Sequence, residues 1–332
     1  SPLVPFQERL TSAVSSRFGG TDTTGCMLSG GLDSYAVALI ARDLAKTTSE
    51  GGLPTYSFVF NESEELDERR YIEAVLKTGG FKASLIEADR FPPLENMEAR
   101  LEEQDGVFLA AGLPRNHRLY QIAAGDNISV LLDGHGGDEV VGYGLGRLME
   151  LARRGKYLSL AFLVPAACKL IDQSPLQTYF EVLERSGGKS KRSMIARRLA
   201  RRINRYGFSE QPEADESVPA DLLNEDLLAL LEEEGALPKH LLTEEFDWIE
   251  EDMAAQLRTL SSPLAQHVFE VLDRSSSRLG ISARFPFYDL GLVELCISLP
   301  SSEKLRRGQT RSILRRALKS RFPREVYRRT DK

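Results

Sequence analysis

GCMLSGGLDS, at residues 25–34, contains a short apolar run, two consecutive glycines and the start of a helical pattern. The apolar run at 25–28 predicts a buried strand that stops at the glycine turn of residues 29–31. From residue 34 to 46 the apolar positions recur at helical spacing. A strand, a glycine turn and a helix N-terminus in this order predict a loop whose backbone N–H groups can bind phosphate.

Three further apolar runs predict strands, and helical patterns separate them along the chain; the runs lie at residues 55–60, 83–86 and 128–132. Strands that alternate with helices indicate an α/β fold, with a parallel sheet flanked by helices. We expect this core to span residues 15–145 and its catalytic groups to lie at the carboxyl ends of the strands. Helical patterns dominate residues 146–332, which we expect to form a mainly helical half that completes the site.

A second glycine-rich stretch, DGHGGDE at residues 133–139, follows the last of these predicted strands. Its three glycines allow the backbone to pass close to a ligand. Because both loops follow strands of one sheet, Asp33 and Asp138 are predicted to share a Mg²⁺ ion that holds a departing pyrophosphate. The simpler alternative is a pair of glycine turns whose aspartates only cap helices.

The composition excludes several classes of protein. The 332 residues are 42% hydrophobic and 28% charged with a net charge of −6, which gives no support for nucleic-acid binding. No apolar stretch is long enough to span a membrane, and the first residues lack a signal peptide. Three separated cysteines and four histidines indicate reduced thiols in a cytoplasmic protein without a zinc site.

Both glycine loops resemble those of the synthetase domain of the asparagine synthetase family, which also contains β-lactam synthetases and lasso peptide macrolactam cyclases. Residues 273–289 are similar to a further conserved stretch of that family. The resemblance runs from about residue 6 to the end and is weakest between 145 and 240. It implies the fold of the PP-loop ATP pyrophosphatases, which is of the adenine nucleotide alpha hydrolase type.

The resemblance implies an ATP- and Mg²⁺-dependent ligase that activates a carboxylate as its adenylate, releases pyrophosphate and then admits an amine. Asp33 and Asp138 are the implied Mg²⁺ ligands. The adenine and ribose would contact Leu28, Val59 and Gly134, although a plain core role for Leu28 and Val59 stays open. The β and γ phosphates would contact the first loop: Ser29, Gly30, Gly31, Leu32, Asp33 and Ser34.

Two catalytic residues also follow from the resemblance. RRTDK, at residues 328–332, is similar to the family's site for a lysine that stabilises the adenylate, so Lys332 is the candidate. A solvated terminal lysine is the alternative, and we expect a natural chain to continue beyond it. His135 stands where asparagine synthetases have a glutamate and β-lactam synthetases a tyrosine, so it is the candidate base for the amine. Alternatively, His135 only hydrogen-bonds a loop carbonyl.

The substrates stay open. The chain starts at Ser1 without the family's glutaminase domain, so we expect no glutamine hydrolysis, and that domain is absent, removed or supplied by a separate partner. The acid is either small or part of a peptide. His135, Ser282 in place of a family glutamate, and a basic segment at 189–205 favour the peptide. That segment forms a solvated amphipathic helix or a surface for an acidic partner. A non-catalytic nucleotide-binding relative is the third possibility.

Overall fold

The computed structural model describes residues 2–19, 23–45, 51–92, 94–108, 112–171, 173–186 and 252–329 of the chain. The chain divides into two compact units. Unit 1 comprises Ser1–Gly144 and Asp252–Lys332, and unit 2 comprises Leu145–Glu251. Both glycine loops lie in unit 1, which therefore contains the candidate site.

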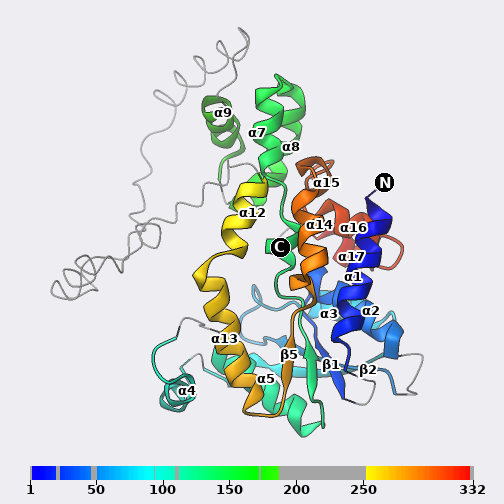
Figure 1. Cartoon of the computed structure of the whole chain (residues 1–332), viewed down its shortest axis with the longest axis vertical. Helices are drawn as coiled ribbons and strands as arrows, with labels where there is room; N and C mark the ends of the chain where they lie inside the picture. Colours follow the sequence, from blue (N-terminus) through cyan, green and yellow to red (C-terminus); the bar gives the residue numbers. More distant parts are fainter. Residues whose placement is uncertain are drawn as a thin grey trace, which may run out of the picture. The chain divides into compact units, whose positions relative to one another are not determined.

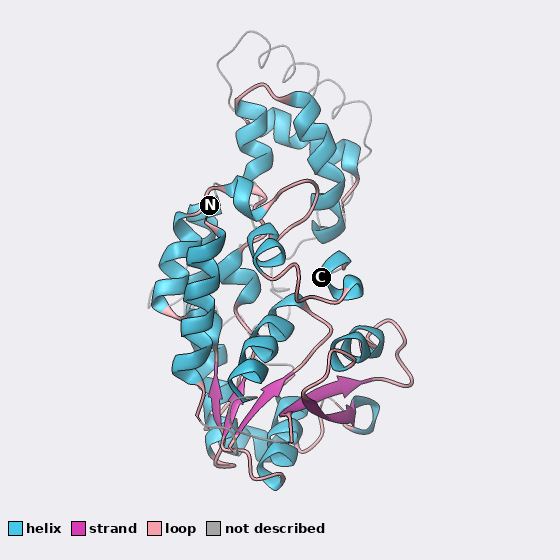
Figure 2. Cartoon of the chain, turned by 90° about the vertical axis from the view of Figure 1, so that its right-hand side faces the viewer, coloured by secondary structure: helices cyan, strands magenta, loops and turns pink. Residues whose placement is uncertain are grey.

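A parallel sheet of five strands forms the centre of unit 1, in the order β3-β2-β1-β4-β5. The predicted α/β fold with a parallel sheet is confirmed, and Figure 2 shows its strands in magenta among the helices. The chain order reverses between β1 and β4, where Cys26 pairs with Leu132. Ligands of such sheets bind at this point, outside the carboxyl ends of the strands. The strands are β1 (Thr24–Met27), β2 (Leu53–Val59), β3 (Phe81–Glu87), β4 (Val130–Leu132) and β5 (Ser282–Arg284).

Helices connect and cover these strands (Figure 1). The amino-terminal part of unit 1 contains α1 (Leu3–Arg17), α2 (Leu32–Ala45), α3 (Arg69–Leu76), η1 (Ala88–Arg90), α4 (Met97–Gln104), α5 (Leu113–Gly125) and α6 (Gly137–Val141). Its carboxyl-terminal part contains α12 (Asp252–Leu260), α13 (Pro263–Ser277), η3 (Pro286–Tyr288), α14 (Leu290–Ser298), α15 (Ser301–Lys304), α16 (Ser312–Ala317) and α17 (Arg324–Arg328).

Alternating side chains of the strands bury two apolar clusters, one on each face of the sheet. On one face, Cys26 and Leu132 pack with apolar residues of α1, α2, α14 and α16. On the other face, Tyr56 and Leu131 pack with residues of α5. Almost every side chain of α2 is buried, which fixes the helix that begins directly after the first glycine loop.

The sheet extends beyond the predicted core of residues 15–145, because β5 comes from the carboxyl-terminal part of the chain and pairs with β4. Its residues, Ser282, Ala283 and Arg284, form no apolar run, so neither hydrophobicity nor alternation marks them as a strand. The α/β core therefore draws on residues beyond 252, and the described helices of the predicted second half belong to both units.

Unit 2 contains, in its described part, the helices α7 (Gly146–Arg153), α8 (Tyr157–Ile171) and α9 (Pro175–Arg185). The basic segment at 189–205 lies outside the described residues, so its two interpretations stay as predictions. Among the helices that the structure describes, none has the length and apolar character needed to cross a membrane.

Candidate functional site

Hydrogen bonds of two serine hydroxyls stabilise the conformation of the first loop. The Oγ atoms of Ser29 and Ser34 lie 2.9 Å apart, and the backbone N–H of Gly31 donates to the Ser29 hydroxyl at 3.1 Å. The N–H of Gly30 donates to a carboxylate oxygen of Glu68 at 3.1 Å. A Cβ at position 30 would lie 2.8 Å from Cβ of Tyr71, closer than real Cβ atoms come to other atoms, so this position favours glycine. The helix begins at Leu32, which places Asp33 and Ser34 in its first turn.

Two glycines of the second loop pack directly against the first loop. A Cβ at Gly134 would lie 2.4 Å from the backbone nitrogen of Ser34, and one at Gly137 would lie 2.2 Å from Cγ of Asp33. Real Cβ atoms do not approach other atoms so closely. These two glycines therefore serve the packing of one loop on the other, and the contact between them holds the Asp33 carboxylate in place.

Substitution of Gly137 by alanine is expected to displace the Asp33 carboxylate, because the new methyl group needs the space that it occupies. We expect the rate of ATP–pyrophosphate exchange to fall about 10²-fold, as for a misplacement of roughly 1 Å in an active site. Gly125, the last residue of α5, is the matched control because a Cβ there meets nothing within 4 Å. Gly125→Ala should keep full exchange; equal rates in both variants would contradict the packing argument.

Two carboxylates from the two loops meet at one guanidinium group. Nη1 of Arg311 contacts Oδ2 of Asp33 and lies 2.5 Å from Oδ1 of Asp138. The guanidinium also lies over the ring of Tyr143, 5.5 Å from its centroid. Arg311 has a φ of +48°, a backbone conformation that costs energy for an L residue and is often found at functional sites. The sequence interpretation missed Arg311, although the family resemblance extends over this part of the chain.

Burial raises the pKa of Asp33 to about 7; the charge of Arg311 opposes this rise and that of Asp138 adds to it. Oδ1 of Asp33 is buried and has no hydrogen-bond partner in the described part of the chain, so the site has unused capacity for a cation. Mg²⁺ in proteins takes one or two carboxylates together with phosphate oxygens and waters, and the donor set fits that pattern. The described residues contain no group of three or more metal-binding side chains.

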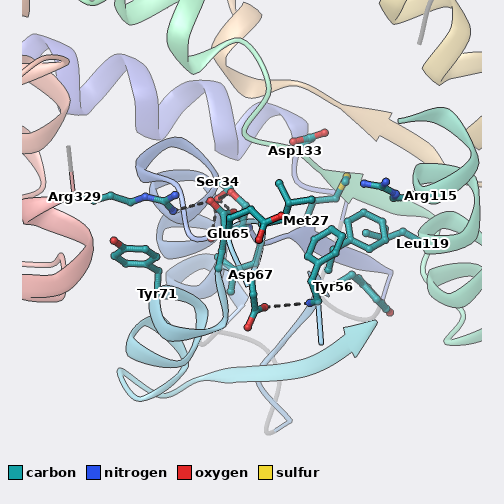
Figure 3. A pocket seen from close by; sticks show the side chains of 16 residues that line it. Met27, Ser34, Tyr56, Glu65, Asp67, Tyr71, Arg115, Leu119, Asp133 and Arg329 are labelled. Carbon is teal, nitrogen blue, oxygen red and sulfur yellow. Dashed lines mark hydrogen bonds and ion pairs between the residues drawn. The ribbon is translucent and has the colours of Figure 1, made fainter. Parts of the chain in front are cut away.

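A cavity of about 650 Å³ opens beside the first loop. Leu28, Ser29 and Ser34 are among the residues that line it. Val59 and Gly134 are not among the residues that line the cavity; Val59 packs in the apolar core and Gly134 packs on Ser34. Figure 3 shows the walls: Arg329 and Tyr71 lie on one side, and Arg115 and Leu119 on the other.

Arg329 comes from the carboxyl-terminal segment and was not predicted. Its guanidinium lies 4.2 Å from the ring centroid of Tyr71 and forms an ion pair of 2.7 Å with Glu68. Because Glu68 also holds Gly30, Arg329 is connected to the phosphate loop through one carboxylate. The signal was present in the sequence, since Arg329 lies within the RRTDK stretch that pointed to Lys332. Lys332 itself lies outside the described residues and stays a prediction.

His135 is exposed on the second loop, and its backbone N–H donates to Oδ1 of Asp133 at 3.0 Å. Among the described residues, no hydrogen bond engages its imidazole, so the alternative of a bond to a loop carbonyl gains no support. The ring instead lies near three aromatic side chains: Phe269, Phe285 and Tyr288. Burial raises the pKa of Asp133, which lines the cavity.

The comparisons with known proteins agree with this geometry. The family model described as asparagine synthase matches residues 5–332, which is nearly the whole chain. No curated protein matches the chain. The matched range includes both glycine loops, β5 and the carboxyl-terminal segment with Arg311 and Arg329. The chain therefore belongs to the asparagine synthase family.

Proposed function

We propose that this protein forms an amide bond at the expense of ATP, through an acyl-adenylate, with release of AMP and pyrophosphate. The observation that carries the proposal is the meeting of Asp33, Asp138 and Arg311 where the order of the strands reverses, beside a cavity of about 650 Å³. Phosphate-binding loops with paired carboxylates and a guanidinium suit the stabilisation of a polyphosphate leaving group.

In the first half-reaction, a substrate carboxylate oxygen attacks the α phosphorus of ATP, and the bond from that phosphorus to the oxygen bridging to the β phosphate breaks. The loop from Ser29 to Ser34 binds the β and γ phosphates, and Asp33 and Asp138 are the residues that would hold Mg²⁺. When bound, Mg²⁺ supplies positive charge to the departing pyrophosphate. Arg311 adds a guanidinium that can turn from the carboxylates to phosphate oxygens, and Lys332 is the further cation.

In the second half-reaction, an amine nitrogen attacks the acyl carbon and the bond from that carbon to the AMP oxygen breaks. His135 is the group proposed to take the proton from the attacking amine. Its exposure and its place on the loop that carries Asp138 support this role.

The acid substrate can be tested by ATP–[³²P]pyrophosphate exchange with Mg²⁺, across small acids that include aspartate and across peptides with Asp or Glu side chains. Exchange with a small acid would support an asparagine-synthetase-like ligase, and exchange with a peptide alone would support a macrolactam cyclase. Formation of ADP and phosphate in place of AMP and pyrophosphate would refute the proposal. A folded protein that binds ATP without any exchange would instead be a non-catalytic relative.

Replacing His135 by alanine is expected to separate the two half-reactions. Amide formation should slow by about 10²-fold or more, the usual effect of losing a general base. Pyrophosphate exchange should stay unchanged, because adenylation needs no proton removal from the amine. Added imidazole should restore part of the amide-forming rate, which a purely structural role of His135 does not predict. Normal amide formation in the variant would contradict the assignment.

A further inference from the structure

Four aromatic rings gather at the outer side of the second loop. They come from the loop itself, from α13 and from the segment β5–η3, and we call His135, Phe269, Phe285 and Tyr288 the aromatic cluster. Phe269 lies at its centre, with centroid distances of 4.6 Å to Tyr288, 4.8 Å to Phe285 and 5.7 Å to His135. The rings of His135 and Tyr288 are nearly parallel, at 6.4 Å.

Packing in the core of unit 1 explains only part of the aromatic cluster. Phe285 packs against a small buried group formed by Leu113, Val271 and Leu272. Phe269 and Tyr288 lie outside the buried clusters that the described residues of unit 1 form. Both side chains are half-buried, and His135 is exposed, so apolar ring surface stays open to solvent. Exposed aromatic surface that borders a functional loop indicates a binding site.

The loop is adapted to hold Tyr288 close. Gly136 has a φ of +90°, and a Cβ at this position would lie 2.1 Å from the Tyr288 ring. The next residue, Gly137, packs on the Asp33 carboxylate. Gly137 therefore faces the first loop, and Gly136 faces the aromatic cluster. A molecule bound on the rings would thus lie beside the reacting groups.

Two carboxylates, those of Glu139 and Asp133, lie near the cluster. Glu139 acts on Tyr288: burial raises the pKa of the Tyr288 hydroxyl, and the Glu139 carboxylate adds to this rise. Oε2 of Glu139 is buried and has no hydrogen-bond partner among the described residues. The Asp133 carboxylate accepts the hydrogen bond from the backbone N–H of His135. Ring faces and carboxylates both attract an ammonium group, the form in which an amine reaches the site.

We propose that the aromatic cluster binds the apolar body of the attacking amine, so that the acceptor is a primary amine with an aromatic or branched aliphatic substituent and not ammonia. This inference rests on the amide-forming reaction proposed above. Phe269, Phe285 and Tyr288 then determine specificity, and His135 at the edge of the same surface faces the amino group.

Phenethylamine and ethylamine differ only in the ring, so they test the inference by equilibrium binding, measured with saturation-transfer NMR titrations. The wild-type protein should bind phenethylamine at least about tenfold more tightly than ethylamine. Phe269→Ala should remove most of this preference. Phe269→Leu, which keeps an apolar side chain of similar size, should remove part of it and guards against a folding defect in the alanine variant.

Phe162→Ala is the matched control, because Phe162 is a 68% exposed phenylalanine of unit 2 and reports non-specific attachment to exposed rings. It should keep the full preference. Equal binding of the two amines by the wild type, or an unchanged preference in both Phe269 variants, would overturn the inference. The titration contains no ATP, so it measures the amine preference independently of catalysis. If no AMP formed in an activity assay, the proposed reaction would be refuted, and the amine preference could still be measured.

Discussion

Replacing Asp33 by asparagine should lower the rate of ATP–pyrophosphate exchange by at least about 10³-fold, which corresponds to roughly 4 kcal/mol of transition-state stabilisation. Asparagine has almost the same shape but no charge. It can neither hold a divalent cation nor pair with Arg311 as the carboxylate does. Because Arg311 keeps its contact with Asp138, the fold should stay intact, which circular dichroism of the variant would check.

Asp138→Asn should have an effect of the same order, and the double variant should lose little more than either single one. Residues that act on one cation are strongly non-additive, since the first change already removes the shared interaction. Asp43 provides the control: it lies on the same helix, α2, and forms ion pairs with Arg42 and Arg321 at the protein surface. Asp43→Asn should retain normal exchange, and fully additive losses at Asp33 and Asp138 would contradict a shared role.

The sequence predicted the part of the site that depends on local pattern. An apolar run that stops at glycines marks β1 and β4 without help from other segments, and the two loops do lie next to each other. Arg311 could not be found in this way. It is 278 residues from Asp33, and only the folded chain brings the start of α16 to the first turn of α2. Resemblance to a family pointed to the region, but not to the contact.

The glycines of the second loop show a different limit. From the sequence, DGHGGDE predicted backbone that approaches a ligand, and glycine permits this. In the structure, Ser34 occupies the space that a side chain at position 134 would need, and Asp33 occupies the space that a side chain at position 137 would need. A glycine pattern reports that something lies close to the backbone, and only the fold identifies what that neighbour is. The same holds for β5, whose three residues are a strand because β4 pairs with them.

Arg315 holds in place the carboxyl-terminal segment of the chain, whose Arg329 lines the cavity. Its buried guanidinium donates to three backbone carbonyls, those of Thr310 at 2.9 Å, Tyr327 at 2.5 Å and Arg329 at 2.7 Å. Burial lowers its pKa to about 10, and the charge of Arg311 acts in the same direction. One side chain thus connects α16, which follows Arg311, to the segment that carries Arg329 into the cavity.

Arg315→Met should lower the free energy of unfolding by about 3 kcal/mol or more, because it keeps the aliphatic volume and leaves three buried carbonyls without donors. Denaturant titration would measure this loss. Hydrogen exchange should show faster opening of α17 (Arg324–Arg328), and ATP should bind at least about tenfold more weakly, since the displaced segment includes Arg329. Arg315→Lys should be nearly as damaging, because one ammonium group cannot reproduce the fixed fork of donors.

Arg316 provides the comparison that separates this role from the general loss of a cation. It follows Arg315 on α16, is partly exposed, and forms an ion pair of 2.5 Å with Glu303. Arg316→Met should therefore cost no more than about 1 kcal/mol and leave ATP binding unchanged. Equal losses in the two variants would mean that the helix needs only positive charge. Alternatively, Arg315→Met could lower the stability strongly while α17 stays protected from hydrogen exchange. That result would mean that the packing of Val326 in the core holds the carboxyl-terminal segment in place, and not the three donated hydrogen bonds.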